Sequence, residues 1–238
     1  MSDKRLQKIG LILLHPLPFD GSIWSGFMDL LPGATYAPTL YQCGDQLTDW
    51  AKEALRCVSE ERLIVVGSSI GGSCALEIAN LAPDRVIGLG LIGSKASCTP
   101  NHEFRKSAVR VLLEQGFDTA WTRYWRPLFD DMTSDEIIKN AHKIASNIAV
   151  SDQVNGVNAF HTRVDRQAVA MSWAKPAVLI SGSSDTHPGS AYLSDLSSKM
   201  ANSRFCSIAG AGHYAILEKP VETKLVLDQF IEEVLATL

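Results

Sequence analysis

The sequence has few cysteines, and none of them forms a C-x-x-C pair. The five lie at scattered positions, 43, 57, 74, 98 and 206, and their number is odd. A disulfide framework or a zinc site requires paired or closely spaced cysteines, so this distribution argues against both. We therefore expect reduced, mostly buried thiols.

A surplus of positive charge and a long apolar run are also missing. The chain has 22 Lys and Arg against 26 Asp and Glu, which leaves no basic footprint for nucleic acid. No apolar run approaches the roughly 18 residues that a membrane span needs. The run Ile9–Leu14 is shorter than a signal-peptide core and leads into His15-Pro16 instead of a small-residue cleavage site. These features predict a cytoplasmic protein without nucleic acid or membrane as a partner.

Short apolar runs alternate with amphipathic stretches along most of the chain. This alternation is typical of parallel strands joined by helices, and 238 residues suffice for one α/β unit with an insertion. The predicted strands lie at 9–14, 34–37, 63–66, 86–92, 177–180 and 204–208. The predicted helices between and after them lie at 22–31, 45–59, 73–81, 190–200 and 221–238.

The pattern changes between about Lys95 and Trp173. This segment has helical periodicity and contains no strand candidate. One helix includes Val109–Leu113 and stops at Gly116, and a second follows a capping sequence at Thr133-Ser134 and runs towards Ile148. A third is predicted at 164–173. We interpret 95–173 as an aromatic-rich helical lid inserted into an α/β core made of residues 1–94 and 174–238.

The segment Gly67-Ser68-Ser69-Ile70-Gly71 stands between a predicted strand and a predicted helix. This is the context that the nucleophile motif G-x-S-x-G requires, since glycines on either side of the serine let strand and helix approach closely. Ser69 occupies the central position of the motif, and Ser68 is assigned to the turn or the pocket wall. The motif alone is common by chance, so it needs partners.

Two predicted strands end in loops that carry suitable partners for Ser69. A serine hydroxyl needs a base, and the base needs a group that orients it. Asp185 follows the strand at 177–180, and His213 follows the strand at 204–208. Singly, an Asp after a strand is explained by turn capping and a His in a Gly-rich loop by structure. The order Ser69, Asp185, His213, each directly after a strand, favours a catalytic triad.

The remaining histidines have simpler interpretations. His102, His142 and His161 fall in the inserted helices, and His187 with Asp185 supplies only two potential metal ligands. Two ligands without a third do not indicate a metal site. The sequence predicts no metal and no cofactor.

Four stretches carry a resemblance to a known family. They are Leu13-Leu14-His15-Pro16 with Trp24 downstream, Gly67-Ser68-Ser69-Ile70-Gly71-Gly72, Gly182-Ser183-Ser184-Asp185, and Gly210-Ala211-Gly212-His213 followed by Leu217-Glu218-Lys219-Pro220. On these the chain resembles α/β-hydrolase-fold proteins of the serine esterase or lactonase type with a helical lid, over nearly its whole length. The resemblance implies Ser69 as nucleophile, His213 as base and Asp185 as orienting acid. It also implies that the Leu17 and Ile70 amides form the oxyanion hole.

The chain departs from the family pattern at three places. Pro16 replaces the usual glycine after His15, which stiffens the oxyanion loop but leaves Leu17 its N–H; His15 itself is interpreted as structural. Only about eight residues precede Ile9, too few for the family's N-terminal antiparallel hairpin, so we expect six parallel strands. Tyr214 follows the base, where related hydroxynitrile lyases have lysine, which makes a lyase a minor alternative.

These observations predict a serine hydrolase that cleaves a carboxylic ester, lactone or thioester of a small-to-medium apolar substrate through an acyl-enzyme. The lid aromatics Trp121, Trp125 and Phe129 are the predicted substrate-binding residues. Two alternatives stay open: hydrolysis of a carbon–carbon bond by the same triad, and a ligand receptor with slow or no turnover. The sequence predicts a small-molecule substrate as partner and does not indicate an oligomeric state.

Overall fold

A six-stranded sheet forms the centre of the molecule, whose structure, a computed structural model, describes residues 8–31 and 33–238. The strand order is β2-β1-β3-β4-β5-β6, and every pair of neighbours is parallel. The strands are β1 (Ile9–Leu14), β2 (Thr35–Tyr36), β3 (Arg62–Ser68), β4 (Val86–Ile92), β5 (Ala177–Gly182) and β6 (Ser203–Ile208). The predicted α/β-hydrolase sheet of six parallel strands is confirmed. The predicted absence of a hairpin before β1 concerns residues 1–7, which lie outside the described residues.

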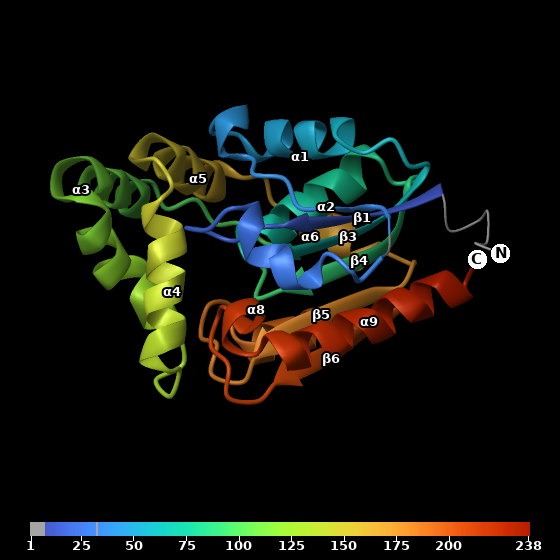
Figure 1. The fold of residues 1–238 in the computed structure, drawn as a ribbon. Helices are drawn as coiled ribbons and strands as arrows, with labels where there is room; N and C mark the ends of the chain where they lie inside the picture. The colour runs from blue at the N-terminus through green and yellow to red at the C-terminus, as the bar shows by residue number, and fades with distance from the viewer. Residues whose placement is uncertain (1–7, 32) are drawn as a thin grey trace.

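Helices cover both faces of this sheet, and the alternation of side chains along β1 shows the two layers. Ile9, Leu11 and Leu13 join one buried cluster, whereas Ile12 and Leu14 join the other. The first cluster packs beneath the 3-10 helix η2 (Gly21–Phe27) and α9 (Pro220–Ala236), and the second beneath α1 (Leu47–Arg56), α2 (Ile70–Leu81) and α7 (Ser190–Lys199). Figure 1 shows α1 and α2 on one side of the strands and α9 on the other.

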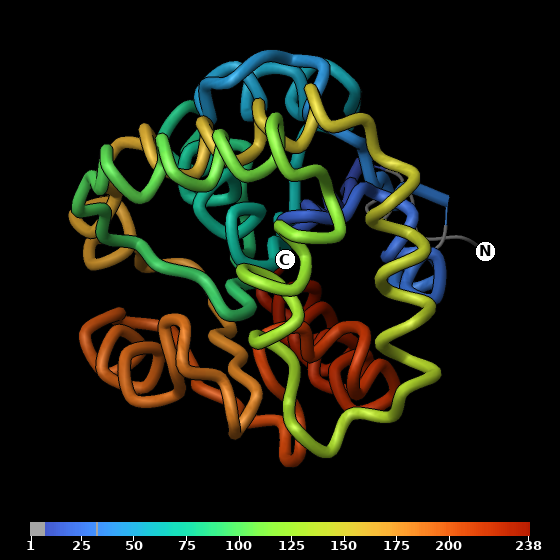
Figure 2. Tube along the Cα trace, turned by 90° about the vertical axis from the view of Figure 1, so that its left-hand side faces the viewer, coloured from blue at the N-terminus to red at the C-terminus, as the bar shows by residue number. Residues whose placement is uncertain are grey.

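Five helical segments between β4 and β5 lie beyond one end of the sheet (Figure 1), and Figure 2 looks directly onto them. They are α3 (His102–Ala120), the π-helix η4 (Trp121–Trp125), the 3-10 helix η5 (Arg126–Leu128), α4 (Asp135–Ser146) and α5 (Val150–Thr162). The sixth, α6 (Gln167–Met171), lies against α2 beside the sheet. We call all six the inserted helices. That residues 95–173 act as a lid stays a prediction. No helix in the described part of the chain is long and apolar enough to cross a membrane.

Several sequence-based expectations about local structure were wrong. The segment predicted as a helix at 22–31 is the shorter 3-10 helix η2, and α5 was not predicted. Helix α5 depends on a tertiary contact: a Cβ at its Gly156 would lie 2.4 Å from the Leu17 side chain and 2.7 Å from Tyr41. Packing that close to the core stabilises a helix whose own sequence has weak periodicity.

The predicted stop at Gly116 is confirmed, because its backbone is non-helical (φ of 82°, ψ of 175°) and separates two helical segments within α3. A further difference concerns the cysteines. All five cysteines are free, but only Cys74 is buried and Cys57 is exposed, so the expectation of mostly buried thiols was wrong.

The inserted helices are joined to the core by a largely buried ion pair, which gives a first prediction. The Glu77 carboxylate on α2 accepts hydrogen bonds from Arg166 Nε (2.6 Å) and Nη2 (3.0 Å) at the start of α6, and from Thr48 Oγ1 (3.1 Å). The side chains are 4% and 21% exposed. Because Glu77→Gln leaves Arg166 without its charge partner, we expect the free energy of unfolding to fall by about 2 kcal/mol, allowing for the partial exposure of Arg166.

Urea denaturation at neutral pH measures this loss. Asp195→Asn is the matched control, because Asp195 pairs with Lys199 on the exposed face of α7 (2.6 Å) and should leave the midpoint unchanged. Equal midpoints for Glu77→Gln and wild type would contradict the prediction.

Candidate active site

Ser69 lies in a sharp turn between β3 and α2, with φ of 54° and ψ of −115°. It is the one non-glycine residue with positive φ in the described part of the chain. The turn is closed by backbone contact: a Cβ on Gly67 would lie 2.1 Å from the Gly71 carbonyl oxygen, and one on Gly71 would lie 2.3 Å from that of Leu14. Only glycine fits at both positions, and the packed surroundings hold Ser69 in its strained conformation. Ser68, by contrast, ends β3 with its hydroxyl buried.

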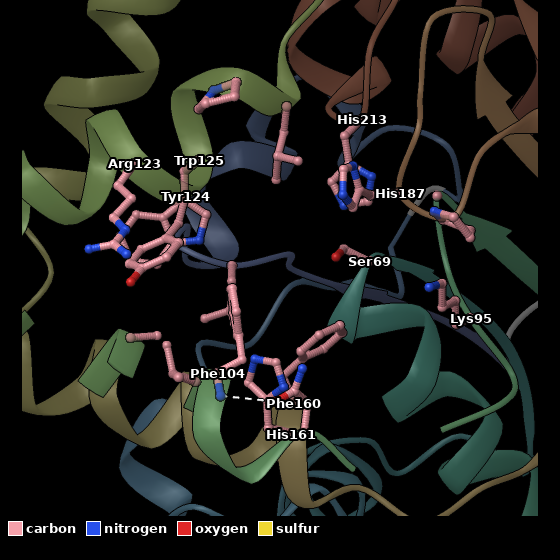
Figure 3. Close-up of a pocket in the computed structure, with 18 of the residues that line it drawn as sticks. Ser69, Lys95, Phe104, Arg123, Tyr124, Trp125, Phe160, His161, His187 and His213 are labelled. Carbon is pink, nitrogen blue, oxygen red and sulfur yellow. Dashed lines mark hydrogen bonds between the residues drawn. The ribbon is translucent and has the colours of Figure 1, made fainter. Parts of the chain in front are cut away.

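His213 and Asp185 form a buried pair at the ends of β6 and β5. His213 Nδ1 lies 3.2 Å from each Asp185 carboxylate oxygen, and the two side chains are 5% and 1% exposed. The His187 amide donates a further hydrogen bond of 2.7 Å to Asp185 Oδ1. Contact through Nδ1 leaves Nε2 as the free ring nitrogen. Figure 3 shows the His213 ring and the Ser69 hydroxyl at the same cavity.

The environment keeps Asp185 ionised. Burial by itself would raise the pKa of this carboxyl, but the hydrogen bond and charge of His213 and the His187 amide outweigh burial and hold the pKa below its ordinary value of 3.8. The backbone also packs tightly here, since a Cβ on Gly93 would lie 3.1 Å from His213 Nδ1 and 3.3 Å from Asp185 Oδ2. The end of β4 therefore forms a wall against which the pair is held.

The loop after β1, with Pro16 and Leu17, is fixed from two sides. The His15 ring is buried and its Nε2 accepts a hydrogen bond from the Leu40 amide (3.2 Å). Burial lowers the pKa of His15 to about 4, so the ring is uncharged at neutral pH. On the other side the Tyr214 hydroxyl donates to the Leu17 carbonyl oxygen (3.0 Å). His15 thus holds the loop in place, which agrees with its structural interpretation.

The Leu17 and Ile70 amides, expected as oxyanion donors, are available for a ligand. Neither donates a hydrogen bond to another residue that the structure describes. Ile70 is the first residue of α2, where amides have no partner within the helix and the helix dipole favours negative charge. Leu17 lines the cavity beside Ser69, whereas the Ile70 side chain is fully buried.

Glu218 organises the His213 loop, a role that sequence reasoning missed. Its Oε1 accepts the Gly212 and Tyr214 amides, each at 3.1 Å, on either side of His213. Its Oε2 accepts the Asp130 amide (2.8 Å) and the Thr133 hydroxyl (2.5 Å). One buried carboxylate therefore ties the loop of the candidate base to the segment before α4. In the sequence, Glu218 stands out only as part of a family motif, and nothing in its spacing indicates these partners.

A cavity of about 560 Å³ opens at Ser69 and His213. Trp125 lines it as expected, but Trp121 and Phe129 do not. Trp121 is buried against Phe19, with ring centroids 6.3 Å apart, and Phe129 against Tyr214, at 4.7 Å. The turn that contains Trp121 and Trp125 is a π-helix, so helical periodicity could not tell which of these aromatics faces the cavity. The side chains that line it without having been predicted include Lys95, Phe104, Arg123, Tyr124, Phe160 and His161 (Figure 3).

Within residues 8–31 and 33–238, no group of three or more His, Cys, Asp or Glu side chains is arranged to hold a metal ion. Asp185 is engaged by His213, and His187 Nδ1 lies 2.9 Å from the Thr186 hydroxyl. Around the cavity the structure has a hydroxyl on a strained turn and an imidazole oriented by a carboxylate. Leu17 also lines the cavity, and the Ile70 amide directly follows Ser69 at the start of α2. Acyl transfer uses these groups.

Comparison with known proteins agrees with this fold. The sequence model of the alpha/beta hydrolase family matches residues 11–223. A thermophilic esterase from Thermogutta terrifontis superposes with a TM-score of 0.85 at 18% identity, covering 95% of this chain and 90% of that one. The enol-lactonase from Burkholderia xenovorans LB400 gives a TM-score of 0.80 at 17% identity, with 94% and 92% covered. No curated protein sequence matches the chain. At these identities the structures support the fold alone.

The lowered pKa of Asp185 predicts a dependence of stability on pH. Because the folded pKa lies below 3.8, the carboxylate contributes stability that is present above this ordinary value and is lost as pH falls through the folded pKa. We expect Asp185→Asn to be less stable than wild type at neutral pH, and the difference to shrink below about pH 4.

Urea denaturation across this range measures the free energy of unfolding for both proteins. Asp84→Asn, at an exposed carboxylate, should follow the wild-type profile. A difference between wild type and Asp185→Asn that stays constant into acid would contradict the assignment.

Proposed function

This chain belongs to the alpha/beta hydrolase family, and on that premise we propose that it is a serine hydrolase. The proposed reaction is cleavage of a carboxylic ester, lactone or thioester through an acyl-enzyme, with Ser69 as nucleophile, His213 as base and Asp185 as the acid that orients it. One observation carries the proposal: the strained Ser69 and His213, which is paired with the buried Asp185, open onto the same cavity.

In the proposed first step Ser69 Oγ attacks the substrate carbonyl carbon while His213 Nε2 takes the hydroxyl proton. Asp185 holds Nδ1 and stabilises the imidazolium that forms, without itself taking a proton. The carbonyl oxygen becomes an oxyanion, and in this proposal the Leu17 and Ile70 amides donate to it. Donors of this kind contribute about 2.7–4 kcal/mol each in other enzymes.

Collapse of this intermediate releases the alcohol or thiol, which leaves with the proton from His213. The acyl group is then bound to Ser69 as an ester. Water then hydrolyses this ester in the same two steps. His213 accepts a proton from the water as the hydroxide attacks the acyl carbon, and Ser69 Oγ recovers the proton as the acid leaves. The volume of the cavity and its aromatic lining support a small-to-medium substrate with an apolar portion.

The names of the structural relatives are consistent with this reaction class, since they include esterases and an enol-lactonase. Their low identity leaves the substrate to be determined by experiment. A cytoplasmic location, expected from the sequence, is part of the proposal.

Ser69→Ala tests the nucleophile directly. We expect hydrolysis of p-nitrophenyl butyrate to fall by about 10⁴-fold or more, because the acyl-enzyme cannot form. A fluorophosphonate probe should label the wild-type peptide that contains Ser69, as read by mass spectrometry. Ser68→Ala is the matched control: this neighbouring hydroxyl is buried without a hydrogen-bond partner, and its loss should change neither readout.

Retained turnover in Ser69→Ala would exclude the proposed role. A wild-type protein that cleaves no ester but cleaves vinylogous diketones would favour carbon–carbon hydrolysis. Tight ligand binding with no turnover of either class would favour a receptor.

Tyr214→Phe tests the oxyanion loop. The substitution removes the hydrogen bond to the Leu17 carbonyl and loosens the peptide that follows Pro16. We expect kcat to fall about fivefold with little change in KM, because the loop acts on the oxyanion and not on the bound ester. Tyr36→Phe is the control. Tyr36 lies on the edge strand β2, and the substitution removes the hydroxyl that donates a hydrogen bond to Glu60. A change confined to KM would contradict this role.

A further inference from the structure

We propose that the substrate is an ester that carries a carboxylate, with Arg123 as the residue that binds this anion and Lys95 as a second cation of the same cavity. This inference deepens the proposed function, on which its catalytic part rests. It follows from the charges that line the cavity and from the partners that those charges lack.

The cavity has cations on its wall and no anion. Of the side chains that line it, Lys95 and Arg123 carry full charge at neutral pH, and none is Asp or Glu. The nearest carboxylate of the site, on Asp185, is 1% exposed and is occupied by His213. This local excess of positive charge contrasts with the net charge of −4 of the whole chain. A cavity of opposite sign to its protein attracts anions selectively.

Both cations are unpaired. Neither forms an ion pair with a carboxylate among residues 8–31 and 33–238. Arg123 packs its guanidinium over the Tyr124 ring, at 5.4 Å from the ring centroid. Stacking on a ring leaves the N–H groups of an arginine free to bind a carboxylate with two parallel hydrogen bonds.

The two cations come from different segments that line the cavity. Lys95 lies two residues after Gly93, which packs against the His213–Asp185 pair. The Lys95 carbonyl oxygen accepts a hydrogen bond from the Ser73 hydroxyl on α2 (3.2 Å). Arg123 comes from the π-helix η4, and Figure 3 shows it across the cavity from Ser69. A carboxylate at Arg123 and a reacting carbonyl at Ser69 therefore imply an extended substrate with its anion remote from the scissile bond.

The wall between them adds to the preference for an anion. His161 lines this part of the cavity, and burial, followed by the charges of Arg163 and Arg105, lowers its pKa to about 4. The His161 ring is therefore neutral, and Arg163 and Arg105 near it add to the positive potential of the cavity. Aromatic and aliphatic side chains, among them Phe104, Leu112 and Phe160, line the space that the chain of the substrate would cross.

The test compares esters that differ only in one terminal group. Monomethyl glutarate and methyl pentanoate have the same chain, with a carboxylate in place of a methyl group, and titration of released acid at constant pH gives kcat/KM for each. Monomethyl succinate and adipate, against methyl butyrate and hexanoate, vary the length. We expect wild type to prefer the anionic ester at one or more lengths by about tenfold, and added salt to reduce that preference.

Arg123→Gln should lower the ratio of anionic to neutral kcat/KM by about tenfold, and Lys95→Gln should lower it less. Arg110→Gln is the matched control: Arg110 of α3 is an exposed arginine, as Arg123 is, but it lies outside the cavity lining, so its replacement should leave both rates unchanged. A second readout is independent of turnover: calorimetric binding of monomethyl glutarate to Ser69→Ala, with and without Arg123→Gln.

The outcomes separate the two proposals. Turnover of neutral esters with no anionic preference, or a preference that Arg123→Gln leaves intact, overturns the anion site while the serine hydrolase stands. If no ester is cleaved, the hydrolase proposal fails. Binding of the monoester that Arg123→Gln weakens would still support the anion site, and binding that it does not weaken would overturn it.

Discussion

Close contact between backbone segments at the turn around Ser69 is the constraint on which the site depends. Gly67 faces the Gly71 carbonyl and Gly71 faces that of Leu14, at distances that leave no room for a side chain. This contact brings the ends of β1 and β3 and the start of α2 to one point. As a result, the loop that carries Leu17 and the amide of Ile70 lie beside the strained serine, and contacts of His15 and Tyr214 hold that loop.

The other half of the site depends on buried polar groups. Asp185 and His213 come from neighbouring strands, and Gly93 at the end of β4 packs against both. Glu218 then holds the backbone on each side of His213 and reaches the segment before α4 with its second oxygen. The loop of the base and part of the inserted helices are therefore held by one carboxylate. Fully satisfied networks of this kind give a site a single geometry.

The proposed catalytic residues and most of the cavity wall come from different parts of the chain. The sheet supplies Ser69, Asp185 and His213, whereas the inserted helices supply most of the cavity wall, including Arg123. Such a division fits a fold that hosts many activities, because the wall can vary while the strand ends stay in place. The positive character of this wall is a property of the assembled helices, since Arg123 is far from Ser69 in sequence.

The sequence by itself determined the six parallel strands, the elbow at Ser69 and the order of the three strand-end residues. These features depend on local patterns: apolar β-branched runs, glycine spacing and the residue that directly follows a strand. Parallel strands bring their carboxyl ends to one edge, so local order along the chain was sufficient to predict that the three residues would lie at the same edge of the sheet.

Only the tertiary structure decided which side chains face the cavity, and what holds the loops. Trp121 and Phe129 pack away from the cavity, whereas Trp125 is buried and also lines it. The π-helical turn at 121–125 sets which of the two tryptophans reaches the cavity. Helix α5 forms because Gly156 lets it approach Leu17 and Tyr41, and Glu218 acts through amides that are distant in sequence or lie on a loop. These are contacts between segments, and a pattern along one segment does not contain them.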